Sequence, residues 1–159
     1  MATPETTIRN AVYDRIAAKK VAATFTDYNA FTLEKAYEPH KDLEDLNALT
    51  QGIVYVVRGA TDQKRITRSF AATIELPIMV GFQRTCDPTD ITTCDQLADF
   101  VEELKDVCRK DVEPTLPQTT FDRVESAKDE NGVPYQFVVM RQANIFEAYF
   151  TAFYKHVKA

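Results

Sequence analysis

A long alternating segment between Ser69 and Arg84 restricts the fold of this chain more than any other feature. Every second residue in it is apolar, whereas the positions between are mixed and include Glu75 and Pro77. Only an extended strand places alternate residues on one side, so the pattern predicts a strand with one face towards a core. Strands usually run about 5–6 residues, and we therefore expect this one to project towards a neighbour. The apolar positions are Phe70, Ala72, Ile74, Leu76, Ile78, Val80 and Phe82.

The composition is that of an acidic globular protein. The chain has 159 residues, of which 45% are apolar and 27% charged, and its net charge is −5. These values predict one domain, residues 1–159, with a substantial core. We expect no membrane segment, because no apolar run approaches roughly 20 residues. We expect cytoplasmic maturation, because the first residues lack the regions of a signal peptide. The acidic balance disfavours general nucleic-acid binding, but it is compatible with a surface past which DNA slides without binding.

Two segments have the periodicity of amphipathic helices. Thr3-Pro4-Glu5 combines a capping hydroxyl, a proline suited to the first helical position and an acid near the positive helix end, which predicts a helix over about Pro4–Ala18. A second helix is predicted over about Cys94–Lys110, with Thr92 and Asp95 at capping-box spacing. The apolar stripes are Ile8, Val12 and Ile16 in the first, and Leu97, Phe100, Val101, Leu104, Val107 and Cys108 in the second.

The segments before the long strand predict two strands and a connector. A strand over about Phe31–Glu38 should end at the proline that follows, because proline cannot extend a ladder. Lys41–Thr50 combines acids with leucines three residues apart, which indicates a helical turn or a short connector. Ile53–Val57 is a continuous apolar run, and it predicts a strand buried on both faces.

The C-terminal half predicts two or three more strands. They are Phe121–Ser126, Gln136–Gln142 and Asn144–Val157, and the last has aromatic residues in both registers, so both of its faces need cover. Within the long strand, Pro77 indicates an edge position, a bulge or a break near Leu76, because it has no N–H to donate. The order of elements predicts an α+β fold: a mostly antiparallel β-sheet with a long β-hairpin and two main α-helices packed on it.

The loop at the tip of that hairpin is basic on an otherwise acidic chain. It runs from Arg58 to Arg68 and contains four cations. Two interpretations stay open: a solvated loop, or a docking loop that orders against an acidic partner surface. The candidate interface residues are Arg58, Lys64, Arg65 and Arg68.

Residues suited to catalysis or cofactor binding form no recognisable pattern. The four glycines are scattered singly, which excludes a phosphate-cradling loop, and neither His40 nor His156 belongs to a catalytic motif. Asp42, Glu44 and Asp45 lack the spacing of a calcium loop. We therefore expect no cofactor, no metal site and no enzymatic activity.

The three cysteines match no zinc or redox motif, since none form Cys-x-x-Cys. Cys86 and Cys94 are near enough in sequence to close a short loop as a disulfide. An odd number of cysteines in a cytosolic chain favours three thiols instead, with Cys108 as a core residue.

The chain resembles the tail terminator family of long-tailed bacteriophages in the order of its elements and in its length. The segments that carry the resemblance are Tyr37-Glu38-Pro39 with Asp42–Leu46, the run Ile53–Arg58, the strand end Ile78–Gln83, the helix Leu97–Val107 and the final Phe153–His156.

The resemblance implies a structural virion protein of the tail or neck, assembled in the host cytoplasm. Such a protein forms a homohexameric ring that caps the tail tube, ends tube polymerisation and offers a surface to the head–tail connector or head-completion protein. DNA passes through the ring without specific binding. On this view Arg58, Lys64, Arg65 and Arg68 contact the tail tube protein or a neighbouring subunit.

Three other functions remain open from the sequence. One is another neck, head-completion or connector ring, and a second is a small phage-encoded binding module that acts on a host protein. A third is a hydrolase that uses Cys86 or His40.

Overall fold

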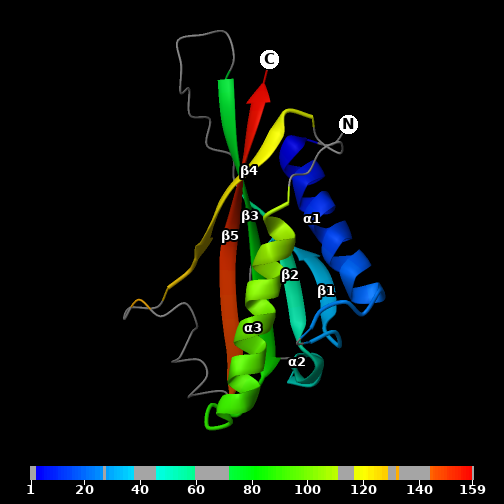
Figure 1. Ribbon diagram of the computed structural model, residues 1–159, viewed down its shortest axis with the longest axis vertical. Coiled ribbons are helices and arrows are strands. Elements are labelled where there is room, and N and C mark those ends of the chain that lie inside the picture. Colours follow the sequence, from blue (N-terminus) through cyan, green and yellow to red (C-terminus); the bar gives the residue numbers. More distant parts are fainter. Residues whose placement is uncertain are drawn as a thin grey trace.

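The fold is a five-stranded sheet with its long helices on one face (Figure 1). The computed structural model describes residues 3–26, 28–37, 46–59, 72–110, 117–128, 132 and 144–158. Along the chain the elements are α1 (Pro4–Val21), β1 (Thr32–Ala36), α2 (Leu46–Gln51), β2 (Ile53–Arg58), β3 (Ala72–Thr85), α3 (Ile91–Cys108), β4 (Thr119–Ser126) and β5 (Ile145–Lys158).

The sheet has the order β1-β2-β3-β5-β4 and is antiparallel except for the β1–β2 pair. β3 and β5 are 14 residues each and pair along their whole length, from Ala72 opposite Lys158 to Thr85 opposite Ile145. The predicted α+β class, with its mostly antiparallel sheet, is therefore confirmed. β2 and β3 are the antiparallel strands of the predicted hairpin, whose connecting loop lies outside the described residues.

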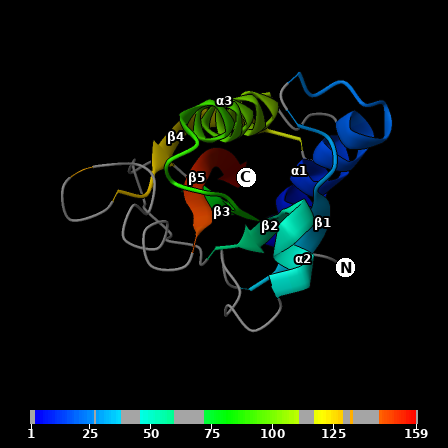
Figure 2. The ribbon, with the colours of Figure 1, turned by 90° about the horizontal axis from the view of Figure 1, so that it is seen from below.

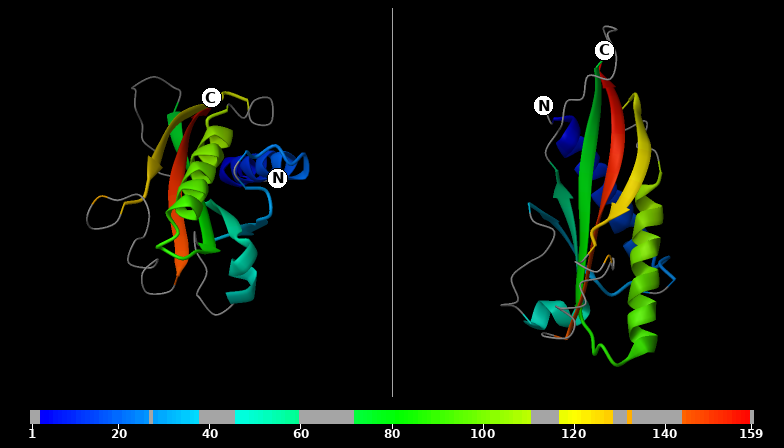
Figure 3. Two further views of the ribbon diagram at one scale, coloured as in Figure 1. Left: turned by 60° about the horizontal axis from the view of Figure 1, so that its bottom comes forward. Right: turned by 90° about the vertical axis from the view of Figure 1, so that its left-hand side faces the viewer.

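α1 and α3 pack on one face of the sheet, whereas α2 lies on the opposite face near one end of β3 (Figures 2 and 3). α1 buries the stripe that its sequence predicts, Ile8, Val12 and Ile16. α3 buries Leu97, Phe100, Val101 and Leu104 towards the same core. None of the described helices is long and apolar enough to cross a membrane.

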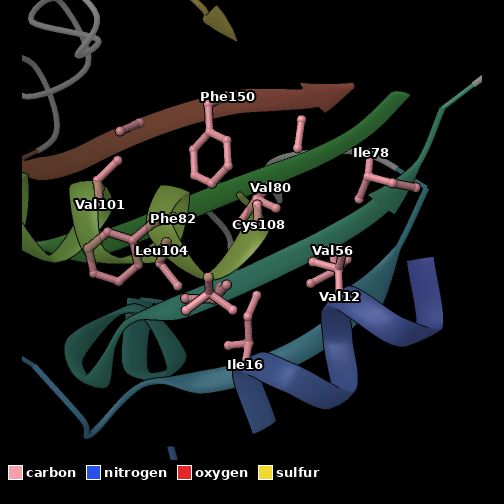
Figure 4. Close-up of a cluster of buried hydrophobic side chains, with 14 of the residues drawn as sticks. Val12, Ile16, Val56, Ile78, Val80, Phe82, Val101, Leu104, Cys108 and Phe150 are labelled. Carbon is pink, nitrogen blue, oxygen red and sulfur yellow. The ribbon is translucent and has the colours of Figure 1, made fainter. Parts of the chain in front are cut away.

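Alternate residues of β3 and β5 form the floor of the main core (Figure 4). The alternation that predicts β3 is confirmed, because Leu76, Ile78, Val80 and Phe82 are all at most 1% exposed. A second, smaller cluster covers the opposite face with Leu49 of α2. Its other buried members are Ile53, Tyr55, Val57 and Ile145, so β2 is buried on both faces as predicted.

Phe100 of α3 is at the centre of an aromatic cluster in the main core. Its ring centroid lies 4.9 Å from that of Phe82 in β3, 5.1 Å from Phe31 and 5.2 Å from Phe25. Edge-to-face and tilted ring contacts of this kind add to the burial of apolar surface. The cluster fixes α3 on the sheet and fixes the segment between α1 and β1 beneath it.

The helix boundaries correct two sequence expectations. α3 begins at Ile91 and not near Cys94, and its cap is Asp90 in place of the predicted Thr92 and Asp95 pair. The Asp90 carboxylate accepts from the Thr93 N–H at 3.2 Å and from the Thr93 hydroxyl at 2.7 Å, which satisfies a free donor of the first turn. α1 continues three residues beyond its predicted end, to Val21.

The other predicted elements match within a few residues where the structure describes them. β1 and β4 correspond to the strands expected at Phe31–Glu38 and Phe121–Ser126, and α2 is the expected helical turn. The predicted strand Gln136–Gln142 lies outside the described residues, as do Lys41–Asp45.

We predict that Phe100→Ala lowers the free energy of unfolding by about 3–5 kcal/mol, because it empties the centre of the aromatic cluster. Denaturant titration followed by circular dichroism measures this change. The control is Ile91→Ala on the same helix, since Ile91 is 64% exposed and its truncation should stay within about 0.5 kcal/mol. Equal effects for the two variants would contradict the assigned packing of α3.

Candidate assembly surface

The two longest strands continue past the end of β2. The last β2–β3 pair joins Arg58 to Ile78, whereas the β3–β5 ladder goes on to Ala72 and Lys158. We call this extension, Ala72–Pro77 with Phe153–Lys158, the ribbon. It forms the upper end of the sheet in Figure 1. Within the described residues, the ribbon part of β3 pairs with β5 on one side and with no strand on the other.

Two hydrogen bonds show which backbone groups face the free edge of β3. The Pro77 carbonyl accepts from the Gly59 N–H at 3.1 Å, on the side where β2 lies. The peptide groups of alternate residues in an antiparallel strand point to the same side, so those of Thr73 and Glu75 also point to this edge. The bond from the Val157 N–H to the Gln118 carbonyl, 3.1 Å, agrees with the same alternation in β5.

The sequence allowed an edge position, a bulge or a break at Pro77, and the structure shows the edge position. β3 is continuous through it, and the missing N–H faces the edge rather than β5. Gly59 makes this junction possible. A Cβ at Gly59 would stand 2.6 Å from the Pro77 carbonyl oxygen and 2.7 Å from its Cγ, which is too close for any other residue without a backbone shift.

Only one of the four predicted interface cations is within the described residues. Arg58 is exposed at the end of β2, and its Nη1 donates to the Thr6 hydroxyl of α1 at 3.1 Å. Lys64, Arg65 and Arg68 lie outside the described residues. Their interface role stays a prediction.

A charged network that sequence reasoning missed lies across β4 and the ribbon, with Arg123 at its centre. The Arg123 guanidinium is 2.8 Å from Glu125, 3.3 Å from Glu75 and 2.6 Å from Asp122. It also stacks 4.0 Å from the centroid of the Phe153 ring. The hydrogen bonds that the Arg123 guanidinium donates to Glu125, Glu75 and Asp122 raise its pKa, and it stays charged at every accessible pH.

Asp122 is the extra residue of a β-bulge between Phe121 and Arg123. The bulge turns its carboxylate towards Lys155 of the ribbon, at 3.2 Å. Desolvation alone would raise the pKa of Asp122, but the hydrogen bonds from Arg123 and Lys155 hold it below its usual value. The alternating charges in Asp122-Arg123-Val124-Glu125 were the only sequence signal for this network, and they do not reveal a bulge.

The network lies at the surface, because the Arg123 side chain is 41% exposed and Lys155 is 45% exposed. Exposed ion pairs contribute little to folding, typically under about 1 kcal/mol. Charges held in a fixed arrangement can complement those of a partner and set its orientation. The ribbon therefore combines backbone groups that pair with no strand among the described residues with a fixed pattern of charges, an arrangement suited to protein–protein contact.

The second face of the sheet also buries polar groups near α2. Gln83 and Glu147 lie on neighbouring strands, are 1% and 8% exposed, and are joined by a bond of 2.8 Å from Gln83 Nε2 to the Glu147 carboxylate. Tyr55 is 1% exposed, and its hydroxyl has no hydrogen-bond partner within the part of the chain that the structure describes. Burial, followed by the charges of Glu34 and Glu147, raises the pKa of Tyr55 to about 12.

The described histidine and the thiols do not form catalytic pairs. His156 Nδ1 is 2.8 Å from the Thr119 hydroxyl in the β4–β5 ladder. Cys86 follows the far end of β3, roughly 40 Å along the strand from the residue that faces His156. Burial is the first cause that raises the pKa of Cys86 to about 12, which disfavours this thiol as the nucleophile of a hydrolase.

The described residues were also compared with the arrangement that a metal ion needs. No three His, Cys, Asp or Glu side chains among them converge in a way that holds a metal ion. The other candidates from the sequence, His40 and the acids Asp42, Glu44 and Asp45, are outside the described ranges.

Two of the chains that comparison with solved structures finds to be similar are as follows. One is from the virion of a native gene transfer agent particle: it is 15% identical, the match covers 95% of this chain and 94% of the other, and the TM-score is 0.45. The second is from the PVC sheath/tube terminator, in the extended state, of an extracellular contractile injection system. It is 10% identical, the match covers 91% of this chain and 56% of the other, and the TM-score is 0.39.

No family model matches the chain, and no curated protein matches it. Identities this low, with TM-scores below 0.5, leave the function to be inferred from the residues of this chain.

We predict that Tyr55→Phe stabilises the protein at pH 7 by about 1 kcal/mol, because it removes a buried hydroxyl without a partner among the described residues. The native state holds the Tyr55 proton more tightly than the unfolded state, whose pKa is about 10. The stability that comes from this proton is complete below pH 10 and is lost as the pH rises to about 12, a loss of roughly 3 kcal/mol.

Urea titrations at pH 7, 10 and 11.5 measure the difference between wild type and Tyr55→Phe, which should widen with pH. Tyr37→Phe, at a position 81% exposed, controls for the loss of one tyrosine. A difference that stays constant over this range would refute the assigned environment of Tyr55.

Proposed function

We propose that this chain is a structural, non-enzymatic virion protein that forms a ring, hexameric in the intact particle, at the end of a phage tail tube. There it ends tube polymerisation and provides the surface that joins the tail to the head. The observation that carries this proposal is the ribbon, whose β3 edge is unpaired within the described residues. An extended partner segment can add a strand to such an edge, and its main-chain hydrogen bonds supply affinity.

A closed ring needs two different surfaces on each subunit, because its contacts are heterologous. The sheet supplies such surfaces: the free edge of β3 in the ribbon, and the outer edges of the terminal strands β1 and β4. The network around Arg123 borders the ribbon and supplies charges that fix the orientation of a partner. The tail tube protein and the head–tail connector or head-completion protein are the further partners that we propose.

Charge also suits a ring that DNA traverses. The chain has a net charge of −5, so its overall field repels the phosphate backbone and permits passage without retention. The family resemblance of the segments from Tyr37 to Phe82 and from Leu97 onwards supports a terminator over other structural roles. Another neck or connector ring is the main alternative, because the same ribbon would provide the contacts of a ring in the neck as well as at the end of the tail tube.

Two measurements test this function. Size-exclusion chromatography with light scattering should show a hexamer, or a monomer that forms rings as the concentration rises. Electron microscopy of particles assembled without the protein should show tails of uncontrolled length or tails without heads. A strict monomer at all concentrations, together with normal particles in its absence, would falsify the proposal.

We predict that Thr73→Pro weakens ring formation at least about fivefold while the monomer remains folded. The Thr73 N–H points to the free edge and not to β5, so its loss removes a donor from the interface and leaves the β3–β5 ladder intact. One such bond contributes about 1 kcal/mol. Sedimentation velocity measures the association, and thermal unfolding of the monomer checks the fold.

Thr73→Ala is the matched control, because it removes the same side chain and keeps the N–H. It should form rings as the wild type does. If Thr73→Pro also assembles normally, the free edge of β3 takes no part in the ring.

We predict that replacing Arg58, Lys64, Arg65 and Arg68 together by alanine disturbs tail length or head joining. The physical reason is the loss of a cluster of positive charge that complements an acidic partner. Particle assembly in cells, scored by electron microscopy, provides the measurement. The control variant replaces four exposed cations elsewhere in the chain: Lys35, Arg109, Lys110 and Lys128. Normal tails in both variants would show that the basic loop has no role in assembly.

A further inference from the structure

Two thiols meet at the corner where β3 leads into α3. Cys86 directly follows β3, Cys94 is in the first turns of α3, and both are free thiols. Their sulfur atoms are 3.5 Å apart. Both sulfurs also approach the Asp87 carbonyl oxygen, at 3.6 Å and 3.7 Å. The two side chains therefore converge on one point from a strand and from a helix.

The backbone on both sides of this pair is held in place. The Cys86 N–H donates to the Asn144 carbonyl at 2.7 Å, which anchors it to the sheet, and the Cys94 N–H donates to the Asp90 carbonyl at 3.0 Å, within α3. Between them, the Asp87 carboxylate accepts from the Thr89 N–H at 2.9 Å. The Asp90 N–H donates to the Asp87 carbonyl at 3.0 Å, which closes the turn.

We propose that Cys86 and Cys94 are a modification site, a dithiol that forms a reversible intramolecular disulfide with a low-molecular-weight disulfide as oxidant. The sulfurs must close from 3.5 Å to about 2.05 Å. Side-chain rotation supplies that movement, since the backbone of both residues is already positioned. The site is independent of the proposed ring function.

The reaction balances in two exchange steps. The Cys94 thiolate attacks one sulfur of the oxidant, which forms a mixed disulfide and expels one thiolate that takes up the proton lost from Cys94. The Cys86 sulfur then attacks the Cys94 sulfur, gives up its own proton and expels the second thiolate, which takes that proton. Two protein S–H groups become one S–S bond, the oxidant is reduced to two thiols, and two electrons pass from the protein to it.

The order of the steps follows from exposure. Cys94 is partly exposed, whereas Cys86 is 6% exposed. Burial and the contact with Cys94 raise the pKa of the Cys86 thiol to about 12, so Cys86 reacts second, once the mixed disulfide has been placed beside it. A surface pocket of about 390 Å³, lined by Thr85, Cys86, Asp87 and Asn144, lies at the same corner.

Cys108 takes no part in this site. It is fully buried near the other end of α3, and roughly 21 Å of helix separates it from Cys94. Its own burial raises the pKa of the Cys108 thiol to about 12. It therefore serves as the internal reference thiol in the test.

The test uses the wild-type protein incubated with oxidised glutathione, followed by thiol counting in denaturant. The count should fall from three thiols to one. No Lys or Arg lies between Cys86 and Cys94, so cleavage at Asp87 and Asp90 is needed to separate the two, and only a disulfide keeps those fragments together in the mass spectrum. Thermal unfolding should shift upwards by about 5 °C, because the disulfide closes a short loop, and dithiothreitol should reverse the shift.

Two variants sharpen the outcome. Cys108→Ala should form the same link and lose all its free thiols, whereas Cys94→Ser should keep two thiols and form none. Three thiols that persist after oxidation, a mixed disulfide that stays on Cys94, a link through Cys108, or a link that lowers the unfolding temperature would each overturn the proposal.

Discussion

The antiparallel ladder between β3 and β5 is the contact on which the rest of the structure depends. Its 14 residue pairs set which side chains of both strands face α1 and α3 and which face α2. A slip of one residue would move Leu76, Ile78 and Val80 from the core to the opposite face, so the apolar alternation and the register enforce each other. β2 and β4 then add to the two sides of a pair that is already specified.

Among the described residues, the ribbon has one β3 edge that pairs with no strand, and its sequence limits indiscriminate pairing there. Unpaired strand edges invite indiscriminate pairing, and proteins limit this with proline, with charges and with short strands. Here the edge carries Pro77 and Glu75, and the outermost strand β1 has only five residues. An incoming strand must tolerate a missing donor at Pro77 and match the charge beside Arg123. The residues that suppress indiscriminate pairing would also restrict the register of a strand that added to this edge.

Periodicity allowed the elements to be predicted, but it could not predict their partners. The alternation at Ser69–Arg84 and the doubly apolar Asn144–Val157 are local patterns, and both are strands at close to the predicted bounds. The pairing of these two strands joins segments that are far apart in the sequence, and local patterns do not predict such pairing. The start of α3 was misplaced because Asp90 and Thr92 are both good caps, and the turn at Asp87 decides between them. The Arg123 network was missed because a bulge creates it.

The full-length pairing of β3 with β5 also determines how the molecule responds to mechanical load. A pull on the ribbon along the strand direction acts on the ladder in shear, so its hydrogen bonds resist together and must fail together. A sideways pull at Lys158 instead opens the ladder from its end, one pair after another. The molecule is therefore stiff along the long axis of its sheet and weak across it. The force that the sheet withstands therefore depends on the direction in which the molecule is loaded.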